Sequence, residues 1–331
     1  MEVKGVKFMY ILGIDGGGTK TTALIADEYG NVYSQAITGR SNPNTLSEEQ
    51  FEHVIIDLLN QLRENNKDIF NRIEVCFAGM AGVGESGRDE KMKSLLLQHL
   101  PLNSLVIVQN DAVNALYSGT LGSPGIVQIA GTGAITIGLN ENKKMVRVGG
   151  WGYLFDDEGS GFYLGNEALR AAFQHYDGRG MDTALTEAII KHFEVKAVPD
   201  LIEKIYGKDH PRSVIAPISR YVVKLAEQGD QIANKIIEKA CKKMMQSIKS
   251  CHSQLFNRDH HTSVILSGGV FTNDVIFIEH FQKLSIESNP NLNFSKTLIP
   301  PVGGAIAAGL RAVQKNIEPN FVEILNNGVK L

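Results

Sequence analysis

The sequence predicts an α/β protein made of two similar domains, and three observations support this. A pattern of strand, Gly turn, strand, turn and strand begins near residue 10 and again near residue 125. Helical patterns follow each copy, as expected when helices cover a mixed sheet. The length of 331 residues fits two domains better than one. Two duplicated halves that face one another can form a cleft between them.

The first half is predicted to open as a meander of three strands. Apolar and β-branched runs predict these strands over residues 10–15, 20–27 and 32–38. Ser47-Glu48-Glu49-Gln50 has the pattern of a capping box and predicts a helix that runs to about residue 65. The elements expected next are a strand over 73–78, a helix over 89–100, a strand over 105–108 and a helix from residue 112.

The second half repeats this order. Strands are predicted over residues 125–130, 134–139 and 144–148. Residues 160–256 are expected to be mostly helical, with a long helical tract from about 219 to 256. Ser263 to Val270 is predicted to form a further strand and Gly turn, and a helix of small residues is expected from Pro301.

Composition excludes several classes of protein. Hydrophobic residues make up 43% and charged residues 21% of the chain, and the net charge is −3. This balance does not indicate a nucleic-acid or anionic-membrane partner, and no apolar run approaches the length of a membrane span. The cysteines are sparse and irregularly spaced, which indicates free thiols in a reducing, cytoplasmic compartment; they are Cys76, Cys241 and Cys251.

The segment from Asp15 to Thr22 has the residues of a phosphate-binding turn. Its three glycines let backbone N–H groups approach phosphate oxygens, and the Asp15 carboxylate suits Mg²⁺. The Thr19-Lys20 order is reversed from a Walker loop, and the residues that follow predict a strand rather than the helix of a dinucleotide fingerprint. We therefore expect a phosphate-binding hairpin. Its phosphate contacts are expected at Gly17, Gly18, Thr19 and Lys20.

Similar turns recur at Gly131-Thr132-Gly133 and at Gly268-Gly269. With the Asp15 turn, their order and spacing resemble the two phosphate motifs and the adenosine motif of the sugar kinase/heat-shock-protein-70/actin superfamily. The resemblance implies two ribonuclease-H-like domains with ATP in the cleft between them. It places nucleotide contacts at Thr132, Gly133, Gly268 and Gly269. The domains expected are 1–118 and 119–331, the second with a helical insertion and a final helix that packs back on the first.

A more specific resemblance lies between residues 149 and 161. Gly149-Gly150-Trp151-Gly152, followed by Asp156-Asp157-Glu158-Gly159-Ser160-Gly161, resembles the N-acetylglucosamine kinase branch. That branch is related to the activator ATPases of 2-hydroxyacyl-CoA dehydratases. The resemblance implies an amino-sugar substrate and a homodimer.

Asp111 ends a predicted strand and precedes a helix, so its carboxylate can project into the cleft. Phosphoryl transfer needs alignment, charge neutralisation and a group that accepts the proton of the attacking hydroxyl. By resemblance, Asp111 is that base and acts on the sugar 6-hydroxyl. The alternative is an N-cap for the helix from residue 112, because capping uses the same side chain.

The sugar contacts are expected at Gly150, Trp151, Gly152 and Asp157 in the second half, and at Asn42 or Asn44 in the first. An indole face can pack on the C–H face of a sugar, and an asparagine amide suits hydroxyls and acetamides. The alternatives are a core tryptophan, acids that stabilise a helix start, and an Asn-Pro-Asn turn.

Together these features predict a Mg·ATP-dependent kinase of an amino sugar, with N-acetylglucosamine as the first choice. Glucosamine and N-acetylmuramic acid are the rival substrates. The rival classes are an ATPase that activates a partner enzyme and a sugar sensor without catalysis. The cysteine spacing is against the iron–sulfur cluster of the first class, and retention of Asp15, Thr19, Asp111 and Thr132 is against the second.

Overall fold

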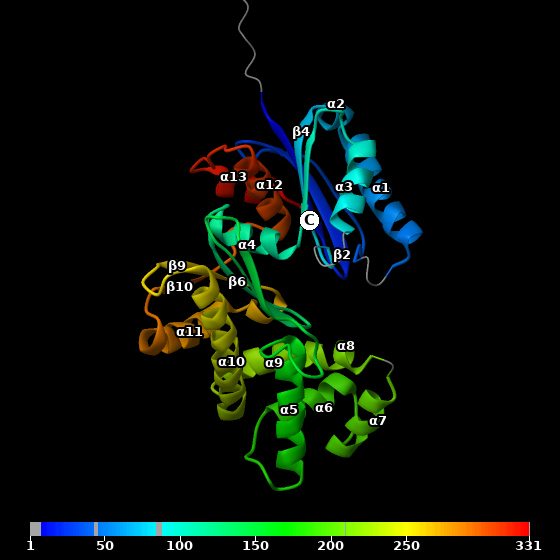
Figure 1. The fold of residues 1–331 in the computed structure, drawn as a ribbon. Helices are drawn as coiled ribbons and strands as arrows, with labels where there is room; N and C mark the ends of the chain where they lie inside the picture. The colour runs from blue at the N-terminus through cyan, green and yellow to red at the C-terminus, as the bar shows by residue number, and fades with distance from the viewer. Residues whose placement is uncertain (1–7, 43–45, 84–87, 209, 331) are drawn as a thin grey trace, which may run out of the picture. The chain divides into compact units, whose positions relative to one another are not determined.

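The computed structural model describes residues 8–42, 46–83, 88–208 and 210–330, and these form two compact units (Figure 1). Unit 1 is drawn from Met1–Ser123 and Thr297–Leu331, and unit 2 is Pro124–Lys296. Unit 2 is therefore continuous in sequence, whereas unit 1 takes its last helices from the end of the chain. The domain limits expected at 118 and 119 stay a prediction.

Unit 1 contains a mixed five-stranded sheet in the order β3-β2-β1-β4-β5. β1 pairs antiparallel with β2 and parallel with β4, and β2 pairs antiparallel with β3. The strands are β1 (Tyr10–Gly16), β2 (Lys20–Asp27), β3 (Val32–Gly39), β4 (Ile73–Met80) and β5 (Leu105–Gln109). The predicted meander is confirmed.

Helices cover both faces of this sheet, with α1 and α3 on one side and α12 and α13 on the other (Figure 1). Successive side chains of a strand point to opposite faces, so Leu12 and Ile14 join the core under α1 and Ile11 joins the core under α12. Burial on both faces explains the continuous apolar run of β1. The helices are α1 (Glu48–Asn65), α2 (Lys67–Phe70), α3 (Arg88–His99), α4 (Ala112–Thr120), α12 (Pro301–Ala312) and α13 (Phe321–Gly328).

The predicted capping box is confirmed at the start of α1. Ser47 Oγ accepts a hydrogen bond from Gln50 N, and Gln50 Oε1 accepts one from Ser47 N. Two backbone donors that the helix itself leaves unpaired are thereby satisfied.

Unit 2 repeats the sheet of unit 1 in the order β10-β9-β6-β7-β8. Its first three strands form an antiparallel meander, and β9 pairs parallel with β6. The strands are β6 (Gly125–Ala130), β7 (Ala134–Leu139), β8 (Met145–Gly149), β9 (Thr262–Ser267) and β10 (Leu292–Lys296). The two predicted copies of one pattern therefore form two sheets with the same strand order.

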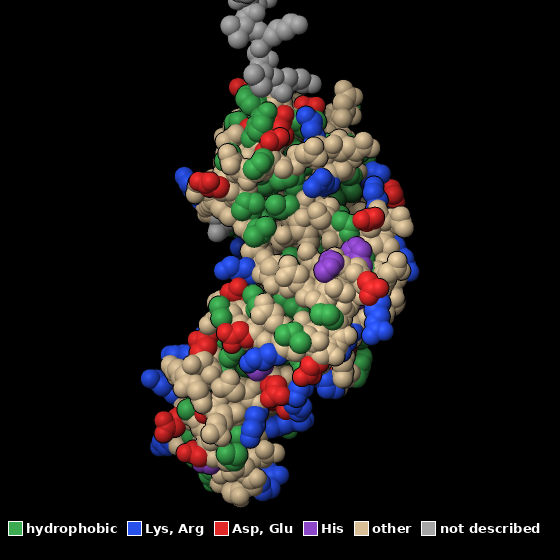
Figure 2. Space-filling view, turned by 90° about the vertical axis from the view of Figure 1, so that its left-hand side faces the viewer, with side chains coloured by type: hydrophobic (Ala, Val, Ile, Leu, Met, Phe, Trp, Pro, Cys, Tyr) green, Lys and Arg blue, Asp and Glu red, His purple; other side chains and the backbone are tan. Residues whose placement is uncertain are grey.

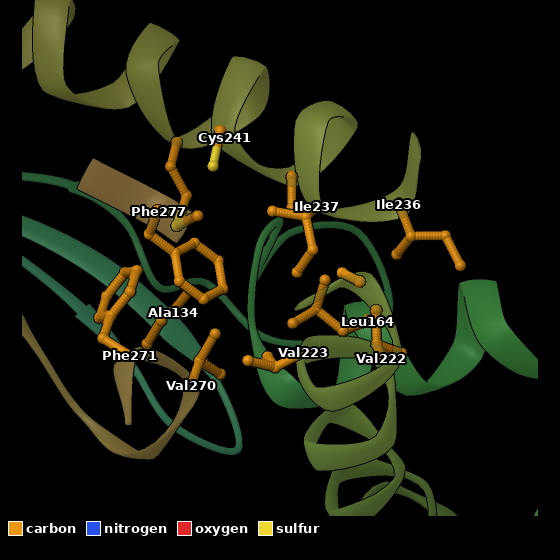
Figure 3. Close-up of a cluster of buried hydrophobic side chains, with 14 of the residues drawn as sticks. Ala134, Leu164, Val222, Val223, Ile236, Ile237, Cys241, Val270, Phe271 and Phe277 are labelled. Atoms are coloured by element: carbon orange, nitrogen blue, oxygen red, sulfur yellow. The ribbon is translucent and has the colours of Figure 1, made fainter. Parts of the chain in front are cut away.

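The helices of unit 2 enclose the larger core, part of which is drawn in Figure 3. There Ile236 and Ile237 of α10 face Leu164 and Val222, and Cys241 of α10 points toward the side of the core that holds Phe277. The helices are α5 (Gly161–Tyr176), α6 (Leu185–Phe193), α7 (Leu201–Tyr206), α8 (Pro211–Ile215), α9 (Ser219–Glu227), α10 (Gln231–Leu255) and α11 (Asp274–Ser288). Short 3₁₀ turns lie at Val198–Asp200, Ala216–Ile218 and Gly269–Phe271.

The helical tract predicted over 219–256 is two helices, not one. Gly229 has φ 89°, a left-handed conformation that ends α9 at low cost because glycine has no Cβ. Asp230 then accepts hydrogen bonds from Ile232 N and Ala233 N and caps α10.

The charge distribution on the surface and the apolarity of the helices are relevant to nucleic-acid and membrane partners. On the face shown in Figure 2, acidic and basic side chains are interspersed. Among the described helices, none has the length and apolarity to cross a membrane.

Candidate active site

The residues predicted to bind ligands fall into two groups, one in each unit. Unit 1 carries Asp15, Gly17, Gly18, Thr19, Lys20, Asn42 and Asp111. Unit 2 carries Thr132, Gly133, Gly150, Trp151, Gly152, Asp157, Gly268 and Gly269. Asn44 lies outside the described residues.

The first phosphate turn is the β1–β2 hairpin, as predicted. Gly17 N donates to Lys20 O at 3.0 Å, which closes the turn and leaves Gly18 and Thr19 exposed. Ser41 N donates to Gly17 O at 3.3 Å, so the chain beside Asn42 lies against the same turn. The geometry leaves the turn open to a ligand.

Asp15, at the end of β1, is held by a residue that the sequence did not single out. Nδ2 of the fully buried Asn114 donates to Asp15 Oδ1 at 2.9 Å and to Ile14 O at 3.0 Å. Burial raises the pKa of Asp15, while the Asn114 hydrogen bond and the Lys20 charge lower it in part. Oδ1 of Asn114 is buried without a hydrogen-bond partner, which adds an unmatched acceptor near the carboxylate. The environment would favour a cation beside Asp15.

Asp111 lies at the N-cap position of α4, but its side chain does not cap the helix. Its backbone is helical, with φ −59° and ψ −22°, and it makes no side-chain capping bond. Instead, Asn110 Oδ1 accepts a hydrogen bond from Ala112 N at 3.0 Å. The capping alternative therefore does not account for this carboxylate.

The electrostatic environment of Asp111 suits proton transfer. Burial, followed by the charge of Asp15, raises the pKa of Asp111 to about 7, although nearby backbone N–H groups offset part of this effect. The two carboxylates are thus close enough to interact. A general base works best when its pKa lies near the operating pH, so Asp111 can accept a proton near neutrality.

The second phosphate turn joins β6 to β7 and is held by the start of α5. Gly161 N donates to Gly131 O at 2.7 Å, and Phe162 N donates to Thr132 O at 3.4 Å. Thr132 is exposed. The helix start thereby fixes the carbonyls of the turn.

The third turn lies beside the second in unit 2. Ser267 pairs with Ile129 across the parallel β9–β6 contact, and Gly268 follows directly. Gly268 adopts φ 106° against the backbone of Ala130 and is exposed. The predicted phosphate and adenosine turns of this unit are therefore neighbours.

Asp157 joins the second turn to the helical insertion. Its carboxylate is buried, with 4% exposure, and Oδ2 accepts a hydrogen bond from Arg212 of α8 at 3.1 Å. Burial raises the pKa of Asp157, whereas Arg212 and the N–H groups of Ala134 and Gly152 lower it. A Cβ on Gly133 would lie 2.3 Å from an Arg212 nitrogen and 2.8 Å from Asp157 Oδ2. A larger residue there would have to displace the ion pair, which occupies that space.

Trp151 is 62% exposed, so the core alternative for this residue is wrong. Its backbone N–H donates a hydrogen bond to Asp156 Oδ2 at 3.0 Å. Glu158 forms an ion pair with Lys243 at 2.9 Å. Each of the three neighbouring acids therefore has its own partner, while Ser160 caps α5. The loop also exposes Leu154 and Phe155, by 77% and 79%.

The three cysteines are free and buried, in β4 and in α10. Burial raises the pKa of all three thiols. Such thiols behave as small core side chains rather than as thiolate ligands. Within the described ranges, no group of three or more His, Cys, Asp or Glu residues is placed to hold a metal ion.

Sequence reasoning missed Asn114 and Arg212, which contact Asp15 and Asp157. It also missed Arg147, whose guanidinium lies over the Trp151 ring. Asn114 carried a usable signal, because it is a polar residue in the apolar first turns of α4. Arg212 is far from Asp157 in the sequence, and nothing local marks their contact.

The chain is similar to a known family of ATPases and to two sugar kinases. Residues 12–312 match the model of the BadF/BadG/BcrA/BcrD ATPase family. An N-acetylmuramic acid/N-acetylglucosamine kinase of Clostridium acetobutylicum is 31% identical, over 88% of this chain and 93% of that protein. An N-acetyl-D-glucosamine kinase of Dictyostelium discoideum is 29% identical, over 91% of this chain and 98% of that protein.

Solved structures share the fold. The ROK family glucokinase of Streptomyces griseus, in complex with glucose and AMPPNP, aligns with a TM-score of 0.57 at 18% identity. The alignment covers 93% of this chain and 100% of that one.

Proposed function

Because the chain belongs to the BadF/BadG/BcrA/BcrD ATPase family, we propose that it is an ATP-dependent kinase of amino sugars. The names of the two relatives support this substrate class. The single observation that carries the chemistry is the Asp111 carboxylate, whose pKa is raised to about 7 beside Asp15.

In the proposed reaction, a sugar hydroxyl attacks the γ-phosphorus of ATP while Asp111 accepts the hydroxyl proton, and the bond from the γ-phosphorus to the β–γ bridging oxygen breaks to release ADP. We propose the 6-hydroxyl of N-acetylglucosamine as the attacking group. Asp111 does not cap α4, and its raised pKa, which nearby backbone N–H groups lower only in part, suits this role. Alignment of the hydroxyl and the phosphoryl group supplies the rest of the acceleration.

The turns supply the nucleotide contacts. Gly17, Gly18, Thr19 and Lys20 of unit 1, with Thr132 and Gly133 of unit 2, would bind phosphate oxygens, and Gly268 and Gly269 would lie against adenosine. Asp15 would hold Mg²⁺, which is commonly bound by one or two carboxylates together with substrate phosphates. The buried Asp15 fits a cation because burial raises its pKa and a bound cation would stabilise the ionised form. When bound, Mg²⁺ would neutralise charge on the phosphates.

The sugar contacts are proposed at Asn42, Gly150, Trp151, Gly152 and Asp157, with Asn44 as the alternative to Asn42. The exposed Trp151 ring supports this role. Asp157 already shares its carboxylate with Arg212, so a sugar hydroxyl would add to an existing ion pair. Glucosamine and N-acetylmuramic acid remain the rival substrates.

We also propose, from the family resemblance, that the enzyme acts in the cytoplasm as a homodimer. Size-exclusion chromatography with light scattering would measure the mass in solution. A mass near one chain of 36.2 kDa would contradict the dimer.

The decisive experiment measures ADP release with a panel of sugars. The panel contains N-acetylglucosamine, glucosamine, N-acetylmuramic acid, N-acetylmannosamine and glucose, and mass spectrometry identifies each product. We expect the highest kcat/KM with N-acetylglucosamine. Equal ADP release with and without sugar would reject the kinase. Asp259→Asn removes an exposed carboxylate and is the control for Asp111→Asn; its ADP release should match that of the wild type.

A further inference from the structure

The loop after β8 presents Trp151 in an unusual way. The residue is 62% exposed, yet its ring is held on one side by Arg147 of β8. The Arg147 Cζ atom lies 4.2 Å from the ring centroid. This is cation–π contact, in which a guanidinium covers one aromatic face.

Arg147 is fixed by hydrogen bonds as well as by the ring. Its Nε donates to Gly149 O at 3.1 Å, and its Nη2 donates to Gly150 O at 2.7 Å. The rigid fork of a guanidinium makes two such bonds in one plane, which a lysine cannot do. The side chain therefore ties the end of β8 to the start of the loop.

The backbone on either side of Trp151 is held in turn. Gly149 and Gly150 have φ of 75° and 77°, and the carbonyls of both accept bonds from Arg147. On the far side of the loop, Asp156 Oδ2 accepts the Trp151 N–H at 3.0 Å. Arg147 thus contacts one face of the Trp151 ring, and Asp156 holds the backbone of the same residue.

An indole ring has two faces, and Arg147 covers one of them. The exposed area of the ring must then lie on the other face and at the edge. We propose that Arg147 is a positioning residue that holds Trp151 so that its outer face receives the C–H face of the amino sugar. It sets sugar affinity rather than the rate of phosphoryl transfer. This inference rests on the proposed function.

The test uses the fact that Trp151 is the only tryptophan in the chain, so tryptophan emission reports on this ring alone. In the wild type, N-acetylglucosamine should change the intensity or wavelength of that emission. Arg147→Met removes the cation and both hydrogen bonds. We expect it to alter the emission of the free enzyme and to raise the KM for N-acetylglucosamine roughly tenfold, as loss of a partly exposed cation–π contact and its anchoring bonds implies.

A role in positioning also predicts what stays constant. The KM for ATP and the kcat at saturating sugar should stay within about twofold of the wild type, since the ring binds ground state and transition state alike. Arg147→Lys keeps the charge but not the fork, so its sugar KM should fall between those of the wild type and Arg147→Met.

Arg220→Met is the matched control. Arg220 Cζ lies 4.9 Å over the Tyr221 ring in the same unit, and Arg220 is exposed. The same substitution there should leave sugar KM and the emission of Trp151 unchanged.

The outcomes separate the inference from the proposed function. Sugar-dependent ADP release by the wild type, with an unchanged sugar KM and emission in both Arg147 variants, would overturn the inference alone. A parallel loss of kcat, ATP binding and thermal stability would also overturn it, since that pattern means a structural role. If no amino sugar stimulates ADP release by the wild type, the proposed function fails and the inference fails with it.

Discussion

At the scale of single residues, the proposed chemistry depends on two carboxylates of unit 1, Asp15 and Asp111. Burial and the neighbouring Asp15 charge both favour the protonated form of Asp111 and raise its pKa to about 7. Most surface carboxylates are ionised at pH 5, so Asp111 titrates at a higher pH than they do. That separation makes its role measurable.

The pH dependence of turnover is the first prediction. As a base, Asp111 must be ionised, so kcat/KM should rise with pH and level off above an apparent pKa of about 7. Asp111→Asn should lower kcat roughly 100-fold or more while ATP binding stays near normal. Steady-state kinetics and nucleotide titration measure both. Near-normal turnover of Asp111→Asn would remove this residue from the base role.

The second prediction concerns stability. A folded-state pKa above the unfolded value of 3.8 means that the folded state binds the proton more tightly, so the contribution of Asp111 to stability falls as pH rises from about 4 to about 7. Asp111→Asn should therefore unfold at a higher temperature than the wild type at about pH 8. The difference should shrink at about pH 5. Thermal unfolding at both pH values tests this, and an equal difference at the two would contradict it.

A third prediction follows from the space around Gly133. An added Cβ would overlap Arg212 and Asp157, so Gly133→Ala should displace the ion pair and the second phosphate turn together. We expect kcat/KM to fall roughly 10- to 100-fold, as small misplacements near a reacting group do. Gly39→Ala, at the end of β3, is the control for activity, because nothing lies within 4 Å of its Cβ position and its φ is not in the left-handed region. Full activity of Gly133→Ala would show that the turn tolerates the shift.

Residue types at turns could be predicted from the sequence, but their partners could not. Asp15 and Asp111 stand next to glycines or at strand ends, and such positions are visible in the sequence. The contacts Asn114–Asp15 and Arg212–Asp157 join residues 99 and 55 positions apart, and only the folded backbone brings them together.

At the scale of elements, α4 and α12 are brought close by small residues. A Cβ on Gly304 would lie 2.0 Å from Asn114 O and 2.8 Å from Ser118 N, both backbone atoms of α4. The helix that carries Asn114 is therefore positioned by direct contact with α12. Backbone atoms cannot move aside as a side chain can.

This contact gives the fourth prediction. Gly304→Ala should lower the free energy of unfolding by about 1–3 kcal/mol, the usual effect of overpacking. Gly303→Ala should cost less, because its Cβ would meet the end of the Leu325 side chain instead. Chemical denaturation of both variants gives the comparison. If Gly303→Ala were the more destabilised, the α4–α12 contact would not be the tighter one.

Regular elements with strong patterns could be predicted, and weak ones could not. β1, β2, β6 and β7 are rich in apolar and β-branched residues, and a Gly turn joins β1 to β2 and β6 to β7. Their predicted limits agree with the structure within one residue. β10 has only Leu292 and Phe294 as apolar residues in five positions and was not predicted. Its pairing with β9 compensates for a weak local signal.

At the scale of the whole molecule, each unit places one meander beside two parallel strands in the same order. Repetition in the sequence predicted this duplication. The repeat alone does not predict that the end of the chain completes unit 1, because that depends on which sheet face α12 buries; the family resemblance instead predicts a final helix that packs back on the first domain. Ile306 and Leu310 of α12 share a core with Ile11 of β1.

The fifth prediction tests this completion. A chain that stops at Lys296 lacks α12 and α13, which leaves the apolar face around Ile11 and Leu24 uncovered. We expect that chain to lose all kinase activity and to bind hydrophobic dyes. A chain of residues 124–296 should keep a cooperative thermal transition, since its core is complete. A truncated chain that retains activity would contradict the prediction.

The division of unit 1 between the two ends of the chain also bears on how the protein is made. Synthesis proceeds from the N-terminus, and domains generally fold as they emerge from the ribosome. All of unit 2 is translated before Thr297, so it can fold while unit 1 still waits for α12. During that interval the first sheet has one bare apolar face. The nascent chain would then need a chaperone on its N-terminal segment, which is translated first, rather than on the segment that has just left the ribosome.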